Sequence, residues 1–210
     1  MTAEIIFPEN EPSVMNFIMK EIFEFEIYDC YKQLTTGMNV IDLGAHVGAF
    51  TVKAASLGAN VMAFEPNSEI LPFLRENTKN LFNVQIVEKA VSNYDGIAYI
   101  QYVPNNSAGT YITEEGDIPT SVTRMDTVLS QQHFTPIDLV KIDVEGQELE
   151  ALQGFGDYLG FVDFFSIASY HYFGESQKIR DFLEQNGFSV FTRRFFGIGL
   201  NNYLYAWRLW

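Results

Sequence analysis

A glycine turn between two short apolar runs constrains this chain more than any other feature. Four segments follow one another there: the strand-like run Val40–Leu43, a turn bracketed by Gly44 and Gly48, the helix-like run Ala49–Leu57, and the strand-like run Asn60–Phe64 followed by Glu65. Together they make up half of a nucleotide-binding fold. The glycines allow the backbone to approach a ligand closely, and a carboxylate after the second strand can accept hydrogen bonds from two ribose hydroxyls.

The spacing of the glycines indicates which nucleotide is bound. Dinucleotide-binding folds need G-x-G-x-x-G, so that a pyrophosphate can sit on the helix N-terminus. Here the central glycine is replaced by His46, and position 49 is alanine. Asp42, two residues before the first glycine, would repel a pyrophosphate but would suit the ammonium group of an amino acid. The pattern D-x-G-x-x-x-G therefore favours S-adenosylmethionine over NAD.

Length and composition set further limits. The chain has 210 residues, 47% of them apolar, which is enough for the core of one α/β domain. No apolar stretch reaches the roughly 18 residues of a membrane span, and the N-terminus lacks the basic start of a signal peptide. Cys30 is the only cysteine and the net charge is −14. We expect a cytoplasmic protein with no membrane span and no nucleic-acid partner; the oligomeric state stays open.

Strand-like and helix-like runs alternate along the chain. Further strands are predicted at Val84–Val91, Ile137–Asp143, Val162–Ser169, Ser189–Thr192 and Tyr203–Leu209. Helices are predicted over 12–36, from a cap at Asn67 or Ser68, after a cap at Asp126, from Gln147, and over Glu175–Asn186. This order predicts an α/β, Rossmann-like class I methyltransferase fold: a seven-stranded, mostly parallel sheet with helices on both faces. The loop before the last strand is too short for a helical crossover, so that strand is expected to be antiparallel.

The same pattern predicts how the chain is divided. Residues 1–210 are expected to form a single domain, in which 1–36 are a helical lid or extension and 37–210 are the Rossmann-like core. Residues 94–122 are polar and are expected to be an insertion in that core. Within it, a stretch with Tyr102 and Tyr111 would overhang the acceptor pocket, and Tyr28 in the N-terminal segment is a candidate for closing over the cofactor.

A second motif, Leu139–Gly146, places Asp143 and Glu145 at the carboxyl end of a predicted buried strand. Ligands of open α/β sheets bind at that edge. The two acids point to the same side if the strand continues and diverge if it turns. Lys141 lies on the same side as Asp143, and either pairs with a carboxylate to organise the sheet edge or takes part in the site.

Three sequence blocks resemble one family. Residues 40–51, 63–67 and 140–148 are similar, in order and spacing, to the three blocks of the FkbM-type methyltransferases, and together span about residues 38–155. The resemblance implies a class I, S-adenosylmethionine-dependent enzyme that methylates a hydroxyl of a small molecule such as a sugar or a polyketide-type natural product. The family often has Asn where this chain has His46, so the polar contact from this position is not carried over.

The resemblance also implies roles for individual residues. Asp42 would order the turn or hold the amino group of the cofactor through water, Glu65 would bind the ribose hydroxyls, and Asp143 would face the methionine part or the acceptor. The full set expected to bind the cofactor is Asp42, Gly44, Ala45, His46, Gly48, Glu65, Pro66, Asn67, Ala90, Val91 and Asp143.

Methyl transfer to a hydroxyl needs a group that accepts the hydroxyl proton. The expected catalytic residues are His171, Asp143 and Glu145, and His46 is a further candidate base. His171 follows a predicted strand and would work as a neutral imidazole near pH 7. The same three residues would also suit a Mg²⁺ ion that acidifies a hydroxyl, which is the less favoured alternative; no metal ligand is assigned.

Two other functions stay open at this stage. An NAD-linked oxidoreductase would need the missing glycine and a catalytic pair that we do not find. A Rossmann-like nucleotide-binding protein without catalysis would bind the cofactor without turnover.

Overall fold

A seven-stranded sheet forms the centre of the computed structural model, which describes residues 4–101, 103, 106–116, 118–195 and 201–208. Its strands are β1 (Asn39–Leu43), β2 (Asn60–Phe64), β3 (Val84–Val87), β8 (Leu139–Ile142), β9 (Phe164–Ala168), β10 (Phe188–Phe195) and β11 (Asn201–Arg208). The strand order is β10-β11-β9-β8-β1-β2-β3. All pairings in this sheet are parallel except the two that β11 makes with β10 and β9, which confirms the predicted sheet and its antiparallel last strand.

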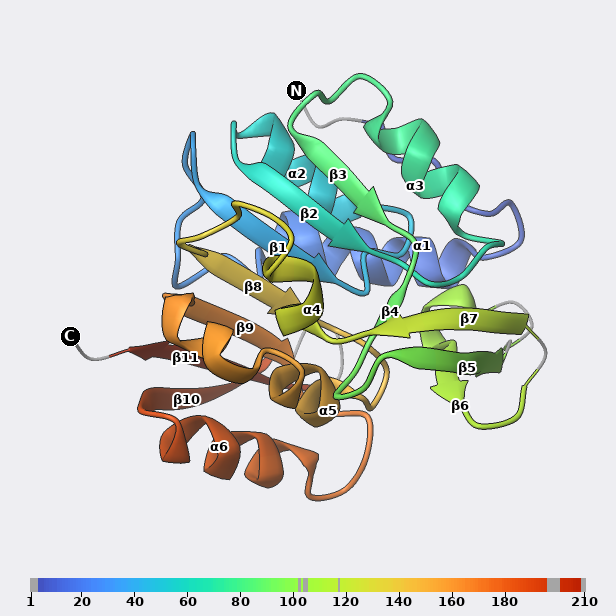
Figure 1. Cartoon of the computed structure of the whole chain (residues 1–210). Coiled ribbons are helices and arrows are strands. Elements are labelled where there is room, and N and C mark those ends of the chain that lie inside the picture. The colour runs from blue at the N-terminus through green and yellow to red at the C-terminus, as the bar shows by residue number, and fades with distance from the viewer. Residues whose placement is uncertain (1–3, 102, 104–105, 117, 196–200, 209–210) are drawn as a thin grey trace.

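Helices cover both faces of this sheet, as predicted (Figure 1). They are α1 (Pro12–Met19), continued by the π-helix η1 (Lys20–Glu24), α2 (Ala49–Ser56), α3 (Leu71–Thr78), α4 (Met125–Leu129), α5 (Glu148–Gln153) and α6 (Glu175–Gln185). Successive side chains of a strand point to opposite faces. Val40 accordingly packs in the core with α1, α2 and α3, and Ile41 packs in the core with α4, α5 and α6.

A smaller sheet lies beyond the carboxyl ends of the parallel strands (Figure 1). Its strands are β4 (Ala90–Val91), β5 (Gly96–Gln101), β6 (Tyr111–Thr113) and β7 (Ile118–Thr123), in the order β4-β7-β5-β6. The insertion predicted at 94–122 therefore has its own strands. The single strand predicted at Val84–Val91 is wrong, because β2 ends at Phe64 and offers no pairing beyond Val87, and β4 pairs with β7 instead.

Three helix boundaries also differ from the prediction. The helix predicted over 12–36 ends at Glu24, and Glu26, with φ of +48°, turns the chain so that Ile27 and Tyr28 enter the core. Helix α3 starts only at Leu71, because the Asn67 side chain accepts a hydrogen bond from the backbone N–H of Glu69 and forms a turn there. Asp126 lies inside the first turn of α4 instead of capping it.

Two expectations concern residues outside the described part of the chain: Tyr102 in the predicted overhang, and most of the turn between β10 and β11, at residues 196–200. In the part that the structure describes, no helix is long and apolar enough to cross a membrane.

Candidate functional site

A cavity opens at the carboxyl ends of β1, β2 and β8, the edge where open α/β sheets bind ligands. One wall is the glycine turn after β1 together with residues 64–67 after β2. The other walls come from α1 and η1, from the smaller sheet with its loop at 107–112, and from the segment after β8. Of the residues expected to bind the cofactor, the lining includes Gly44, Ala45, His46, Glu65, Pro66, Asn67, Ala90, Val91 and Asp143.

The glycine turn brings the backbone close to the chain after β8. Gly44 has a φ of +75°, and a Cβ at this position would lie 1.9 Å from the carbonyl oxygen of Asp143. At Gly48, where φ is +88°, a Cβ would lie 2.6 Å from Cδ1 of Leu74. The positive φ and the close contact favour glycine at each of these two positions. Gly48 lies behind the turn, against α3, and shapes the cavity without lining it.

Glu65 is held by the turn that it faces. Its Oε2 accepts a hydrogen bond of 2.8 Å from the backbone N–H of His46, and its Oε1 accepts one of 2.9 Å from the backbone N–H of Asn67. Burial raises the pKa of Glu65 to about 7, although these two hydrogen bonds act in the opposite direction. The carboxylate keeps lone pairs free to accept hydrogen bonds from a ligand in the cavity.

Nδ2 of Asn67 and Nδ1 of His46, on the same wall as Glu65, are buried polar atoms that have no partner among the described residues. Burial, and then the nearby Lys141 ammonium, lower the pKa of His46 to about 4, so that its ring is neutral. Buried polar groups in native proteins are hydrogen-bonded, so these atoms indicate a polar ligand. Together with the glycine turn and Glu65, they fit the nucleoside of S-adenosylmethionine.

Asp42 lies behind the turn and does not belong to the described lining. It is fully buried, accepts a hydrogen bond of 2.6 Å from Thr51 and pairs with Lys141 at 3.1 Å. Lys141 also donates a hydrogen bond of 2.6 Å to the carbonyl oxygen of Gly44. Of the two roles expected for Asp42, these contacts support the ordering of the turn. Because Asp42 lies behind the turn, we no longer include it among the residues that would contact the cofactor. Lys141 organises the sheet edge and also borders the cavity.

A hydrogen-bonded contact closes the cavity between the insertion and the glycine turn. Nε2 of His46 lies 2.7 Å from the hydroxyl of Ser107, and that hydroxyl donates a hydrogen bond to Glu11. The backbone N–H of Ser107 donates a second hydrogen bond to Glu11, at 3.0 Å. Ser107 thus ties the insertion to the segment before α1, and Tyr111 of the same insertion lines the cavity as expected.

Replacing Ser107 by alanine is expected to lower the free energy of unfolding by about 1–3 kcal/mol, because it leaves buried groups of Glu11 and His46 without a partner. Urea denaturation measures this loss. Ser121→Ala is the matched control, because Ser121 is exposed on β7, and it should stay close to the wild type. Equal stability of the two variants would show that the Ser107 contact does not hold the insertion.

The wall of the cavity that follows β8 is acidic, because it contains Asp143 and Glu145. Strand β8 ends at Ile142, and Glu145 adopts a left-handed φ of +56° in the turn that follows. This conformation brings its carboxylate toward the same side as that of Asp143, although the strand does not continue. Non-glycine residues in this conformation are strained and occur preferentially at functional sites.

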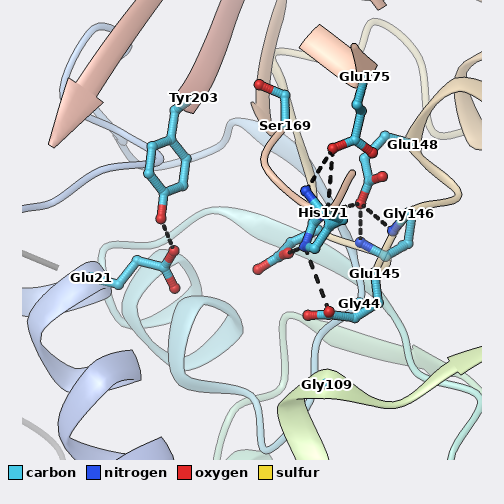
Figure 2. Close-up of polar contacts among 12 residues, drawn as sticks. Glu21, Gly44, Gly109, Glu145, Gly146, Glu148, Ser169, His171, Glu175 and Tyr203 are labelled. Atoms are coloured by element: carbon cyan, nitrogen blue, oxygen red, sulfur yellow. Dashed lines mark hydrogen bonds and ion pairs between the residues drawn. The ribbon is translucent and has the colours of Figure 1, made fainter. Parts of the chain in front are cut away.

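His171 lies among four acidic side chains, and Figure 2 shows Glu145, Glu148 and Glu175 around it. Nε2 lies 3.4 Å from Oδ1 of Asp143 and 3.6 Å from Oε2 of Glu145. Nδ1 lies 3.2 Å from Oε1 of Glu148 and 3.7 Å from Oε2 of Glu175. The three predicted catalytic residues are therefore close together.

The surroundings of His171 favour a protonated imidazole over the neutral, proton-accepting one of the prediction. Burial alone would lower its pKa, but pairing with Asp143, Glu148 and Glu175 outweighs burial and raises the pKa well above neutrality. The described lining of the cavity also includes Asp143 and Glu145 but not His171. Asp143 has a pKa of about 2, because His171 and Lys141 outweigh its burial, whereas burial and then Asp143 raise the pKa of Glu145 to about 8.

Several residues of this site were not predicted. Glu148 and Glu175 begin α5 and α6, where first-turn acids are common and give no sign of a site.

Tyr28 is buried, and its hydroxyl lies 2.8 Å from Oδ2 of Asp143, so it positions this carboxylate and is not the expected lid over the cofactor. Instead Phe17, Ile18, Glu21 and Ile22 of the N-terminal helices line the cavity.

Comparisons with known proteins agree with this geometry. The family model described as "Methyltransferase FkbM domain" matches residues 42–190. The chain is similar to the 31-O-demethyl-FK506 methyltransferase FkbM of Streptomyces tacrolimicus, with 28% identity over 178 residues, 67% of this chain and 68% of that protein. It is also similar to the hexuronic acid methyltransferase AglP of Haloferax volcanii, with 30% identity over 125 residues, 59% of this chain. That alignment spans about half, 52%, of AglP.

Among solved structures, the magnesium protoporphyrin IX methyltransferase ChlM of Synechocystis PCC 6803 with bound SAM has a TM-score of 0.52. Its sequence identity to this chain is 16%, and the alignment covers 95% of this chain and 79% of ChlM. At this identity the likeness concerns the fold, which is that of the class I methyltransferases.

Proposed function

Because this chain belongs to the FkbM methyltransferase family, we propose that it uses S-adenosylmethionine to methylate a hydroxyl group of a small molecule. The observation that carries the proposal is a single cavity that has the glycine turn and Glu65 on one wall and two carboxylates on another. The first wall fits a nucleoside, and the second offers oxygen atoms that can accept a proton.

The first wall would bind the cofactor. Glu65 would accept hydrogen bonds from the ribose hydroxyls, since the backbone N–H groups of His46 and Asn67 fix its carboxylate in place. The unpartnered Nδ2 of Asn67 would donate a hydrogen bond to the same ligand. Ala90 and Val91 at the adjoining wall offer an apolar surface for the adenine.

The second wall would bind the acceptor and take its proton. When bound, S-adenosylmethionine supplies an activated methyl group, so alignment of the acceptor provides much of the rate. A hydroxyl acceptor must still lose its proton, and Glu145 is the carboxylate that we assign to this step. Asp143 and His171 would position Glu145 and the acceptor, and Tyr28 would hold Asp143.

The net charge of the chain and the names of two similar proteins indicate which acceptors to test first. The net charge of −14 disfavours a nucleic-acid phosphate backbone as partner. AglP and FkbM are named for methylation of a hexuronic acid and of a demethylated FK506, which supports sugars and polyketide-type natural products as the acceptors to test first.

A product assay tests the proposal. The protein is incubated with S-adenosylmethionine and a panel of sugars, uronic acids and polyketide alcohols, and release of S-adenosylhomocysteine is measured. We expect release that depends on one class of acceptor and yields a methyl ether. Cofactor binding without release for any acceptor would favour a binding protein without catalysis. NADH-dependent reduction would contradict the proposal.

The buried position of Glu65 predicts a pH dependence of cofactor binding. Its pKa of about 7 is raised by burial, and ribose hydroxyls favour the ionised carboxylate. Binding is therefore strongest above pH 7 and weakens as pH falls through that value, by up to about tenfold per unit. Calorimetry between pH 5.5 and 7.5 measures this trend, and Glu65→Gln should bind more weakly but show a flat profile. A wild-type profile as flat as that of the variant would contradict the assignment.

A further inference from the structure

We propose that Asp143, Glu145 and His171 form a binding site for a divalent transition-metal ion at the acidic wall of the cavity. The same three residues take part in the proposed methyl transfer. Only the role that we give to the ion, and not its binding, rests on the proposed function. Binding itself follows from the arrangement of the side chains and is measured without cofactor or acceptor.

Three ligand atoms converge at this position. Nε2 of His171 lies 3.4 Å from Oδ1 of Asp143 and 3.6 Å from Oε2 of Glu145, and all three atoms lie within 4.8 Å of one another. Two ligand atoms that each lie about 2.1 Å from one cation are roughly 3.0–3.4 Å apart at octahedral or tetrahedral angles. A small contraction would therefore bring the three atoms around one ion.

The ligand atoms lack other partners among the described residues. The side chain of His171 is only 9% exposed, and neither ring nitrogen makes a hydrogen bond of acceptable geometry. Oδ1 of Asp143 is buried and also has none. A buried imidazole aimed between two carboxylates, without a hydrogen bond to either, points to a ligand at this acidic cluster.

The other side of the imidazole is arranged as in metal-binding histidines. Such a histidine usually presents its second ring nitrogen to a carboxylate, which fixes the orientation of the ring. Here Nδ1 faces Glu148 at 3.2 Å, and Glu148 is itself held by the backbone N–H groups of Val144 and Gly146. Figure 2 shows Glu148 and Glu175 on this side of His171. Nε2 would bind the ion after its proton is released to solvent, while Nδ1 keeps its proton on the side of Glu148.

Charge at the site favours a cation. Four carboxylates surround one imidazole, and the side chains of Glu148 and Glu175 are 0% and 1% exposed. The nearby ammonium of Lys141 is engaged by Asp42 and by the carbonyl oxygen of Gly44. Buried charges need partners of opposite sign, and a divalent ion would bring more positive charge than the single proton that it displaces from His171.

The mixed donor set indicates the class of ion. Carboxylates alone suit Mg²⁺ and Ca²⁺, whereas imidazole together with carboxylates suits Mn²⁺, Fe²⁺ or Zn²⁺. With one nitrogen and two oxygens from the protein, positions remain open for water or for an acceptor oxygen. The ion would lower the pKa of an acceptor hydroxyl bound there, and one oxygen of Glu145 would remain free for the proton.

Titration with Mn²⁺ tests the proposal. The protein is treated with EDTA and dialysed, and binding is followed by calorimetry and by electron paramagnetic resonance. We expect one Mn²⁺ per chain, a nitrogen coupling from His171 in the pulsed spectrum, and weaker competition from Mg²⁺. Glu145→Gln and His171→Gln should each weaken binding at least about tenfold, and His171→Gln should abolish the nitrogen coupling.

The controls make the outcome decisive. Glu184→Gln, an exposed carboxylate on α6 away from the cavity, should bind Mn²⁺ as the wild type does. Glu145 is 27% exposed, so its glutamine variant is expected to fold, and circular dichroism checks this. Absence of saturable binding, or equal affinity in Glu145→Gln and Glu184→Gln, would overturn the metal site. Neither result would affect the separate assays of cofactor binding and methyl transfer.

Discussion

Replacing Glu145 by glutamine is expected to lower kcat for methyl transfer by about a hundredfold or more, while affinity for S-adenosylmethionine stays within about twofold. Glu145 borders the cavity next to Asp143, and its strained backbone directs the carboxylate there. Glutamine keeps the size of the side chain but cannot accept the acceptor proton. The expected loss is the same whether Glu145 acts alone or also binds an ion.

Single-turnover and steady-state assays of the methylated product measure this effect, with calorimetry for the cofactor. Glu184→Gln is the control, because it removes one carboxylate far from the cavity, and it should retain wild-type kcat. His171→Ala should also lower kcat through loss of positioning, without weakening the cofactor. Normal turnover of Glu145→Gln would mean that the acceptor proton leaves by another route and would remove Glu145 from the reaction.

Replacing Glu65 by alanine is expected to weaken cofactor binding by about 2–3 kcal/mol, roughly 30- to 150-fold in Kd, because two ribose hydroxyls would lose a charged acceptor. The change also leaves the backbone N–H groups of His46 and Asn67 without their partner. Calorimetry with S-adenosylhomocysteine measures the affinity without turnover.

Glu88→Ala is a matched control for this variant, since Glu88 is an exposed carboxylate after β3 that pairs with Arg75. Its Kd should equal that of the wild type. Thermal unfolding of both variants separates loss of the ligand contact from loss of the fold. A Glu65→Ala variant with unchanged Kd would show that Glu65 only ends β2 and orders the turn.

The sequence predicted the main sheet because its signals are local. Glycines at 44 and 48, the apolar runs of β1 and β2 and the acid after β2 all lie within 26 residues of chain. The alternation of strands with helices predicted that most strands are parallel, and the short last connection predicted that the last strand is antiparallel. The order β10-β11-β9-β8-β1-β2-β3 itself depends on long-range packing that the strand pattern does not determine.

The parts that the sequence did not predict depend on contacts between distant segments. Ser107 and Glu11 are 96 residues apart, and Tyr28 and Asp143 are 115 residues apart. The carboxylates of Glu148 and Glu175 reach His171 only because α5 and α6 both start at the same edge of the sheet. For this reason the proximity of Asp143, Glu145 and His171 was predictable, whereas the protonation of His171 was not.

Calorimetric titration of the wild-type protein with S-adenosylmethionine, and separately with NADH, tests the central claim most directly. The account predicts saturable binding of one S-adenosylmethionine per chain, loss of most of that affinity in Glu65→Ala, and no heat of binding with NADH. Binding of NADH in the absence of S-adenosylmethionine binding would contradict it.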